Sequence, residues 1–499
     1  MAARIEDYAL IGDCETTALV GRDGSIDWLC WPRFDSDACF AKLLGGEEHG
    51  YWRIAPRDGA AKITRHYRDC TLILETRFET DSGAVTLIDF MPLRRETSDI
   101  VRLVKGERGS VEMCMKLAIR FGYGATVPWV SRQEDGSVRA VAGPDMILLR
   151  AGTTVHGEDL KTVAEFTVHE GETIPFVLSY EASHLPLPAP LDALAALRDT
   201  EAFWRRWTRK YAGGSRWSDA VIRSLITLKA LTYAPTGGIV AAPTTSLPEQ
   251  IGGERNWDYR FCWVRDATLT LLALMNSGYY AEAGAWRDWL MRAVAGSPDQ
   301  MQIMYGIAGE RRLTEYEVSW LPGYENSAPV RIGNAAHDQL QLDVYGELMD
   351  ALHQARRGGI EPLEADWALQ RAILDHLETI WKEPDEGIWE TRGGRQHFTY
   401  SKVMAWTAFD RGVKSIEEFG LPGPLDRWRR IRQDIHDAVC RHGYDSSRGT
   451  FVRAFGSKAL DASLLLLPAV GFLPPEDGRV RGTIARIERD LLVDGYVRR

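Results

Sequence analysis

The chain has 499 residues, of which 60 are basic and 70 are acidic, so its formal net charge at pH 7 is −10. This balance provides no basic surface for nucleic acid or for an anionic membrane, and it suits a soluble, neutral substrate better. A chain of this length predicts two domains, or one large two-layer domain, with an ample hydrophobic core.

Two further features of the composition limit the class of protein. No apolar run approaches ~20 residues and the first residues contain no hydrophobic stretch, so we expect neither a membrane span nor a secretory signal, and we expect a cytoplasmic chain. The seven cysteines are scattered and form no C-x-x-C pair. This pattern argues against a disulfide framework and against a structural zinc site.

The first part of the chain reads as short β-like runs separated by turn residues. Such runs cover 18–20, 25–29, 71–78, 84–90, 100–104 and 173–180. Apolar runs of this length, broken by Gly, Asp and Ser, are typical of antiparallel strands. We therefore expect residues 1–190 to form an N-terminal antiparallel β-sandwich domain.

The periodicity of the apolar residues changes after the proline-rich segment 185–190. Residues 191–214 predict a helical linker that ends at two glycines, and residues 215–499 follow a helical period. The expected helices cover 218–233, 266–277, 281–295, 338–357, 364–382, 400–419, 425–442, 459–470 and 479–492. Aromatic and polar clusters lie in the loops between them, which suits a closed ring of helix pairs with a site at one mouth.

The most informative segment is 256–266, Asn-Trp-Asp-Tyr-Arg-Phe-Cys-Trp-Val-Arg-Asp, which runs directly into an expected helix. Aromatic faces accept the C–H faces of a sugar ring, and an adjacent Arg and Asp can hold its hydroxyls. The segment therefore indicates carbohydrate binding. A more ordinary interpretation is that Asp266 caps the helix that follows.

A second segment, 385–390, places Glu390 directly after Trp389. A large apolar neighbour raises the pKa of a carboxyl group and prepares it to act as a general acid. The alternative is a surface carboxylate in a turn, which is what we expect of Glu383, Asp385 and Glu386.

The order of these motifs resembles glycoside hydrolase family 15. The resemblance rests on 256–266, on Trp320 with 323–334 (Gly-Tyr-Glu-Asn-Ser-Ala-Pro-Val-Arg-Ile-Gly-Asn), and on 387–390 (Gly-Ile-Trp-Glu). Residues 10–36 look like the β-domain of the bacterial glucoamylase-like and trehalase-like members. The resemblance implies a β-sandwich followed by an (α/α)6 barrel, which hydrolyses α-glucosidic bonds with inversion and releases glucose from a non-reducing end.

The resemblance also implies roles for individual residues. Glu390 matches the general acid, and Arg265 and Asp266 match the pair that holds the hydroxyls of the terminal glucose. Trp263 would lie beside the sugar ring and Tyr259 near the reacting centre. A planar guanidinium and a fixed carboxylate suit this recognition because their hydrogen-bond geometry is rigid.

Four further residues are candidates for substrate binding. Trp389 flanks the acid, and Trp320 stands where the family has a loop tryptophan near it. Arg331 lies in a segment whose glycine permits close backbone approach. Lys402 either faces the same pocket or is a solvated lysine at the start of a helix.

The chain departs from the family pattern at its C-terminal end. Family members carry the catalytic base in a Gly-Glu segment near the end of the barrel, and no segment here matches it. A complete ring needs twelve helices, whereas about nine are expected. We therefore expect an incomplete barrel, a general base beyond residue 499, and poor hydrolysis by this chain. Exposed helix faces would then favour association into a homo-oligomer. We expect Asp343 and Glu347 to serve structure rather than to replace the base.

Several functions remain open at this stage. Glucoamylase-like hydrolysis of α-glucans and a trehalase activity share these motifs, and they differ in what fills the leaving-group side of the site. A glycoside phosphorylase would need a cationic phosphate pocket, and a non-catalytic α-glucan-binding or regulatory protein would not need the acid. The histidines are isolated, so we expect no metal and no cofactor.

Overall fold

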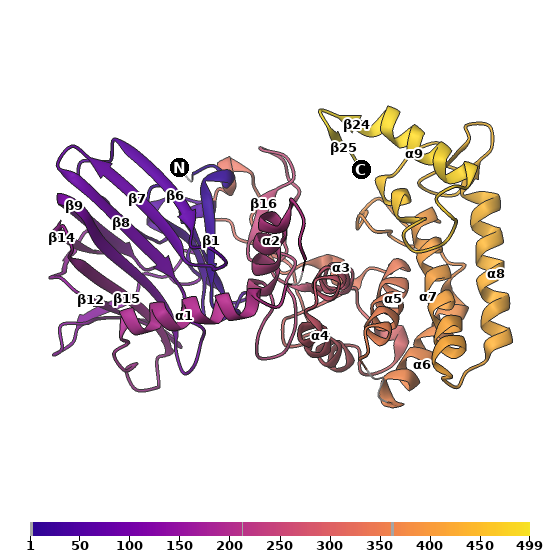
Figure 1. Ribbon diagram of the computed structural model, residues 1–499, viewed down its shortest axis with the longest axis horizontal. Helices are drawn as coiled ribbons and strands as arrows, with labels where there is room; N and C mark the ends of the chain where they lie inside the picture. The colour runs from indigo at the N-terminus through magenta and orange to yellow at the C-terminus, as the bar shows by residue number, and fades with distance from the viewer. Residues whose placement is uncertain (1–2, 212, 361–363) are drawn as a thin grey trace. The chain divides into compact units, whose positions relative to one another are not determined.

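The computed structural model describes residues 3–211, 213–360 and 364–499 (Figure 1). Two compact units make up the chain. The first combines Met1–Phe261 with Thr314–Asn334, and the second combines Cys262–Leu313 with Ala335–Arg499. The domain boundaries expected at residues 190 and 214 differ from this division and stay a prediction.

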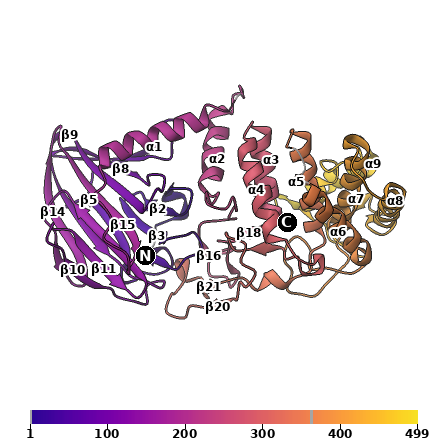
Figure 2. The ribbon, with the colours of Figure 1, turned by 90° about the horizontal axis from the view of Figure 1, so that it is seen from below.

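The first unit is built on a 15-stranded antiparallel sheet (Figure 2). Its strands are β1 (Tyr8–Gly12), β2 (Thr17–Gly21), β3 (Ser25–Cys30), β4 (Ala38–Phe40), β5 (Tyr51–Pro56), β6 (Lys62–Tyr67), β7 (Leu74–Thr80), β8 (Gly83–Phe90), β9 (Ser98–Ala118), β10 (Trp129–Arg132), β11 (Val138–Ala142), β12 (Asp145–Ala151), β13 (His156–Glu158), β14 (Lys161–His169) and β15 (Thr173–Ala182).

Strand β9 joins the two sets of strands that make the sandwich. Its first half pairs with β8 and β15, and its second half pairs with β5 and β14. The apolar core between the sets draws on both, for example Val85 and Ile147 from one and Trp52 and Met115 from the other. The expected β-sandwich is therefore confirmed.

The expected strands fall on β2, β3, β7, β8, β9 and β15. One expected strand, 71–78, begins three residues late because the chain turns first. The backbone of Cys70 has a φ of 60°, and the hydroxyl of Thr71 accepts from the N–H of Ile73 at 3.1 Å. This local side-chain bond competes with strand pairing.

The stretch expected as a linker is helix α1 (Ala193–Thr208). It begins where the carboxylate of Asp192 accepts from the N–H groups of Leu194 and Ala195 at 3.0 and 2.9 Å, which satisfies two donors of the first turn. One face of α1 is buried on the sheet with residues such as Phe90 and Val101. The helix is therefore packed on the sandwich rather than free.

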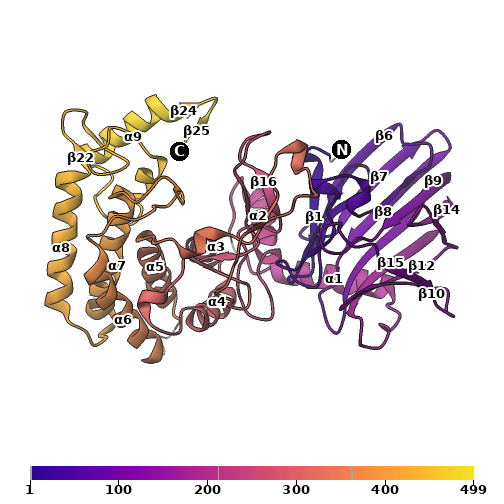
Figure 3. The same cartoon turned by 180° about the vertical axis from the view of Figure 1, so that it is seen from behind.

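Helix α2 (Ser218–Ala230) and four short strands complete the first unit: β16 (Thr245–Pro248), β17 (Asn256–Asp258), β20 (Tyr316–Glu317) and β21 (Arg331–Ile332). The second unit is mostly helical (Figure 3). Its helices are α3 (Val264–Asn276), α4 (Tyr280–Ala293), α5 (Asp343–Arg357), α6 (Glu364–Ile380), α7 (Thr399–Phe419), α8 (Leu425–His442) and α9 (Gly478–Leu491), with short strands β18 (Cys262–Trp263), β19 (Met304–Tyr305), β22 (Tyr444–Asp445), β23 (Thr450–Phe451), β24 (Leu492–Val493) and β25 (Tyr496–Val497).

Helices α5 and α7 form the centre of the second unit. A methyl group added at Gly346 on α5 would meet the carbonyl oxygen of Met404 on α7 at 2.1 Å, so the two backbones touch where the glycine stands. Almost every side chain of α5 is buried, including charged ones. These two helices also carry the polar side chains described below.

The expected helix over 459–470 is wrong. Only a short 3-10 helix, Ala462–Leu466, forms there. The carboxylate of Asp461 accepts from the N–H of Ser463 at 2.9 Å, and Pro468 follows without an N–H to continue the ladder. The helix expected over 338–357 starts at Asp343, after a 3-10 turn over Ala335–Asp338.

Two expectations drawn from composition meet the structure here. In the described part of the chain, no helix combines the length and the apolarity that a bilayer crossing needs. All seven cysteines are free thiols; Cys14, Cys30, Cys39 and Cys262 are buried.

Candidate active site

Trp263, Arg265 and Asp266 lie where β18 ends and α3 begins. Strand β18 pairs with β19, so Trp263 is held at the end of a small ladder and the helix starts at the next residue. Trp263 occupies the position before the first helical residue. Asp266 is therefore not the capping residue; it lies in the first turn, where a carboxylate interacts favourably with the helix dipole.

Glu390 lies in a loop between α6 and α7 whose backbone has positive φ angles at Gly387, Glu390 and Gly394. Gly387 has a φ of 71° and Glu390 has a φ of 53°. The N–H of Glu390 donates to the carbonyl of Gly387 at 3.1 Å, which closes a tight turn. A left-handed backbone is unfavourable for a glutamate and marks strain of the kind found at functional sites.

The loop brings the carboxylate of Glu390 against the start of α3. The indole N–H of Trp263 donates to its Oε1 at 2.6 Å, and Nη2 of Arg265 donates to the same oxygen at 3.4 Å. The side chain of Glu390 is 18% exposed. Burial raises the pKa of Glu390 above its usual value, although Arg265 and the Trp263 hydrogen bond oppose the rise.

Arg265 links Glu390 to two residues at the start of α5. Its Nη1 donates to the side-chain oxygen of Gln341 at 3.2 Å and to Asp343 at 3.3 Å. Asp266 lies 3.7 Å from its Nε. Burial works against the charge of Arg265, but the surrounding carboxylates, Asp343 first, raise its pKa above the usual value.

Behind Arg265 stands a buried acidic pair on one face of α5. Burial raises the pKa of Asp343, and Arg265 opposes that rise. Burial also raises the pKa of Glu347 to about 8, and the hydroxyl of Tyr400 donates to Glu347 at 2.7 Å. Both carboxyls are enclosed by protein groups, which agrees with the structural role expected for them.

Lys402 is 1% exposed, so the solvated lysine considered from the sequence is wrong. Its ammonium donates to the carbonyl oxygens of Trp381 and Glu383 at 2.7 and 2.5 Å. Burial lowers the pKa of Lys402 to about 8, with Asp385 opposing the shift. Its expected contact with substrate stays a prediction.

The sequence interpretation placed the indole of Trp389 beside the carboxyl group of Glu390, but in the structure this indole contacts Asp461. The indole N–H of Trp389 donates to both carboxylate oxygens of Asp461, at 3.0 and 2.9 Å, and 37% of the residue is exposed. The indole that contacts Glu390 is Trp263. Sequence reasoning missed Asp461 and Gln341; the Asp-x-Ser capping pattern at 461–463 was the one available signal for Asp461.

Three expected site residues belong to the first unit: Tyr259, Trp320 and Arg331. The indole of Trp320 donates to the carbonyl of Tyr123 at 3.0 Å, and the residue is 48% exposed. The guanidinium of Arg331 donates to the carbonyl of Glu254 at 2.7 Å and lies 4.5 Å from the ring centre of Trp257. Their roles in binding stay predictions.

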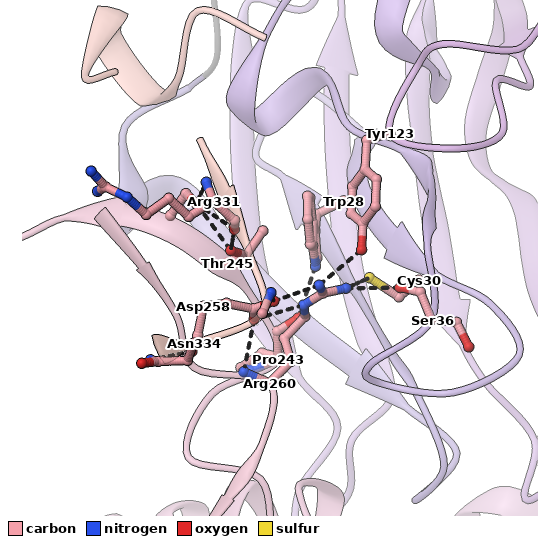
Figure 4. A network of polar contacts seen from close by, with 12 residues as sticks. Trp28, Cys30, Ser36, Tyr123, Pro243, Thr245, Asp258, Arg260, Arg331 and Asn334 are labelled. Atoms are coloured by element: carbon pink, nitrogen blue, oxygen red, sulfur yellow. Dashed lines mark hydrogen bonds and ion pairs between the residues drawn. The ribbon is translucent and has the colours of Figure 1, made fainter. Parts of the chain in front are cut away.

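In the sequence, Tyr259 lies between Asp258 and Arg260. These two neighbours form a fully buried ion pair (Figure 4). Nη2 of Arg260 lies 2.7 Å from Asp258 and donates to the hydroxyl of Tyr123 at 2.8 Å, and Nη1 donates to the carbonyl of Ser36 at 2.8 Å. This network ties the loop before the second unit to the β-sandwich. In the described residues, no three His, Cys, Asp or Glu side chains gather as a metal site.

Two family profiles match the chain. "Glycosyl hydrolases family 15" matches residues 216–499, and "Trehalase-like, N-terminal" matches residues 1–186. A trehalase of Mycobacterium tuberculosis is 36% identical over 525 aligned positions, which cover 99% of this chain and 77% of that protein. A trehalase of Thermoplasma volcanium is 34% identical, with 99% of this chain and 80% of that protein covered.

A bacterial glucoamylase solved in complex with acarbose has a similar fold. Its TM-score is 0.72 at 13% identity, covering 99% of this chain and 79% of that chain. The expected combination of a β-sandwich and an (α/α)6-type helical domain is confirmed by this likeness. The coverage gives no support to the expected C-terminal truncation.

Proposed function

The chain belongs to family 15 of the glycosyl hydrolases, and we propose that it hydrolyses the α-glucosidic bond of trehalose with inversion, with Glu390 as the general acid. The observation that carries the proposal is the position of Glu390. Its carboxyl group is largely buried, its pKa is raised by that burial, and it is held by Trp263 and Arg265 on the neighbouring helix start.

These properties are what a general acid requires. The acid must carry a proton near neutral pH and give it to the leaving oxygen as the glycosidic bond breaks. Burial favours the protonated form of Glu390, whereas the opposing contacts from Trp263 and Arg265 stabilise the carboxylate that remains after the proton has left. The two influences together allow Glu390 to release its proton when the glycosidic bond breaks and to take up a new proton before the next cycle.

Arg265 and Asp266 would hold the terminal glucose. Arg265 is fixed by Gln341 and Asp343, so its guanidinium does not have to be ordered when a sugar arrives. The side chain of Asp266 is 43% exposed and is available to hydroxyl groups. A charged acceptor and a rigid donor next to the acid select one orientation of the ring hydroxyls.

Trehalose is the substrate that the relatives favour. Relatives named trehalases resemble this chain along almost its whole length, whereas the likeness to a glucoamylase is a likeness of fold at 13% identity. The proposal therefore takes the trehalase alternative of the sequence interpretation over the glucoamylase-like one. Both reactions protonate the oxygen beside a terminal α-glucose, and they differ in the leaving group.

Inversion also requires a second carboxylate, ~6.5–9.5 Å from the first, to activate water. Asp343 is engaged by Arg265, and Glu347 accepts from Tyr400 and keeps its proton up to a pKa of about 8. We assign the base to neither residue.

The test is a substrate panel followed by proton NMR of the first product. Trehalose, maltose, maltotriose and isomaltose are each incubated with the protein, and the anomer of the released glucose is read before it equilibrates. We expect turnover of trehalose, with one β-glucose and one α-glucose released per molecule cleaved. Faster release from maltotriose would replace trehalase with glucoamylase-like activity, and binding without glucose release would favour the non-catalytic alternative.

A further inference from the structure

The β-sandwich of the first unit contains a cavity of about 560 Å³. It lies between the two sets of strands, with β9 and β14 on one side and β10, β11 and β12 on the other. Its volume falls within the range of sites for small molecules, ~300–1,000 Å³. The hydrolytic site described above uses no residue of this cavity.

The inner wall of the cavity is aliphatic. Its buried lining side chains are Leu117, Ile119, Val138, Ala140, Leu149 and Val155. None of these side chains can hydrogen-bond, so a sugar entering here would leave its hydroxyl groups without partners, which is unfavourable. The aliphatic wall therefore favours a ligand with a hydrocarbon chain over a sugar.

Three cations line the same cavity, Arg120, Arg132 and Lys161, and of these Arg120 is the buried one. Arg120 is 7% exposed, and its Nη1 donates to the carbonyl oxygens of Ile119 and Leu160 at 2.7 and 3.3 Å. Burial lowers its pKa, with no carboxylate among the causes. Within the described ranges no acidic side chain forms an ion pair with Arg120. A buried charge without a counter-ion is costly, and an anionic ligand would offset that cost.

The mouth of the cavity is formed partly by the hairpin between β13 and β14. Asp159 and Leu160 are the two turn residues, with φ angles of 46° and 58°, and Leu160 is 73% exposed. An exposed leucine in a left-handed backbone is strained, and strain of this kind is found at ligand clamps. Trp129 on β10 adds a second apolar side chain to the lining, 81% exposed.

The charges at the rim are distributed unevenly around this mouth. Glu158 faces His156 at 3.7 Å on the hairpin, and Lys161 lies 3.5 Å from Glu47. Glu158 and Lys161 each have a charged partner there, as Arg120 does not. An anionic group would be drawn to Arg120 rather than to the hairpin.

From the aliphatic wall, the uncompensated Arg120 and the exposed apolar side chains of Leu160 and Trp129 at the mouth, we propose that the cavity binds a single-chain acyl carboxylate, with the hydrocarbon chain inside the sandwich and the carboxylate on Arg120. No bond is made or broken in this binding. The proposal does not depend on the substrate of the hydrolytic site.

The first experiment is isothermal titration calorimetry of the full chain with dodecanoate, dodecan-1-ol and acetate. Dodecanoate carries both features, whereas the alcohol carries the chain alone and acetate the charge alone. We expect dodecanoate to bind at least tenfold more tightly than either. Equal affinity for dodecanoate and the alcohol, or displacement of dodecanoate by maltotriose, would overturn the proposal.

Variants then locate the site. Arg120→Gln keeps an amide donor for the carbonyl of Leu160 but removes the charge, and it should weaken dodecanoate by roughly ten- to a hundredfold because hydrogen bonds to charged groups are worth ~1.5–3 kcal/mol. Ala140→Phe, which fills the cavity, should abolish the binding of both dodecanoate and dodecan-1-ol. Unchanged dodecanoate affinity in either variant rejects the cavity.

A surface pair keeps the test valid if a buried substitution disturbs folding. Leu160→Asp and Leu160→Asn both tolerate the left-handed backbone, and they differ in one charge at the mouth. We expect the aspartate variant to bind dodecanoate about three- to tenfold more weakly than the asparagine variant, with no such difference for the alcohol. Equal dodecanoate affinities in the two variants would contradict the placement of the carboxylate.

Discussion

The indole N–H of Trp263 donates a 2.6 Å hydrogen bond to Oε1 of Glu390, a residue 127 positions further along the chain. The bond stabilises the carboxylate, whereas burial of the same group stabilises the carboxylic acid. The proton affinity of Glu390 is therefore set by two opposing influences from different parts of the second unit.

The first prediction concerns the acid itself. Glu390→Gln should lower kcat on trehalose by about 10²–10⁴-fold, because the amide cannot protonate the leaving oxygen. The same variant should keep most of its rate on α-glucosyl fluoride, whose leaving group needs no proton. Glu383→Gln, an exposed change in the loop before Glu390, serves as the control and should retain wild-type rates. Equal losses on both substrates would point to a structural defect.

The second prediction concerns pH. Loss of the Glu390 proton should produce the alkaline limb of kcat/KM, and that limb should lie above the ordinary glutamate pKa of 4.5. Trp263→Phe removes a hydrogen bond to the ionised form, so the pKa of Glu390 should rise and the limb should move to higher pH. In Trp389→Phe, whose indole contacts Asp461, the limb should stay in place. A limb that moves to lower pH in Trp263→Phe contradicts the assignment.

The third prediction separates binding from folding at Arg265. Arg265→Lys keeps the charge but loses the planar fork that reaches Gln341, Asp343 and Glu390, and kcat/KM should fall by roughly 10–100-fold. Most of the loss should appear in KM if the guanidinium holds the terminal glucose. Arg429→Lys, a surface change that faces Glu417, is the control. A lower melting temperature with unchanged KM would leave Arg265 with a structural role alone.

The fourth prediction links Glu347 to stability. Its folded pKa of about 8 lies above the ordinary glutamate pKa of 4.5, so the folded protein holds a proton that the unfolded chain releases as the pH rises. The contribution of Glu347 is complete below pH 4.5 and is lost by pH 8. Glu347→Gln cannot ionise and should be more stable than wild type at pH 8, by on the order of 4 kcal/mol, with little difference near pH 4.5. The free energies of unfolding in urea should be measured for both proteins across this pH range. If the two curves run parallel, the raised pKa of Glu347 is rejected.

The fifth prediction concerns the turn that presents the acid. Gly387 has a φ of 71°, and a methyl group there would lie 2.6 Å from the ring of Phe398. Gly387→Ala should cost ~1–2 kcal/mol of stability from the backbone alone and should also lower kcat by displacing Glu390. Gly393→Ala in the same loop meets no atom within 4 Å and should leave both quantities near wild type. Thermal unfolding and trehalose turnover measure the two effects.

Much of the fold could be predicted from local pattern. The β runs of the first part and the helical period of the second are properties of neighbouring residues, and they identified β8, β15, α7 and α8 closely. The failure at 459–470 has a local cause as well, since Asp461 and Pro468 both work against a helix. The division into two units could not be predicted, because it depends on which distant segments share a core.

The candidate site divides in the same way. Glu390, Arg265 and Asp266 were found because their order matches a family pattern. The indole that contacts the acid was assigned to Trp389, its neighbour in the chain, but the left-handed backbone at Glu390 directs the carboxylate to Trp263 instead. Gln341 carries no motif, and the capping pattern at 461–463 marks Asp461 without indicating its contact with Trp389, which depends on packing.

The buried pair Asp258 and Arg260 has a consequence for how the protein can be made and divided. It lies inside the stretch matched by the hydrolase profile, 216–499, yet it is enclosed by Tyr123 and Ser36 of the sandwich. A fragment cut between the two profiles would expose this ion pair to water and would remove the hydrogen bonds of Arg260 to Ser36 and Tyr123. Strand β17 contacts β21, which follows much later in the chain, so during synthesis the first unit can complete its fold only after β21 has been made. The two matched modules are thus joined in folding even where they are separable in sequence.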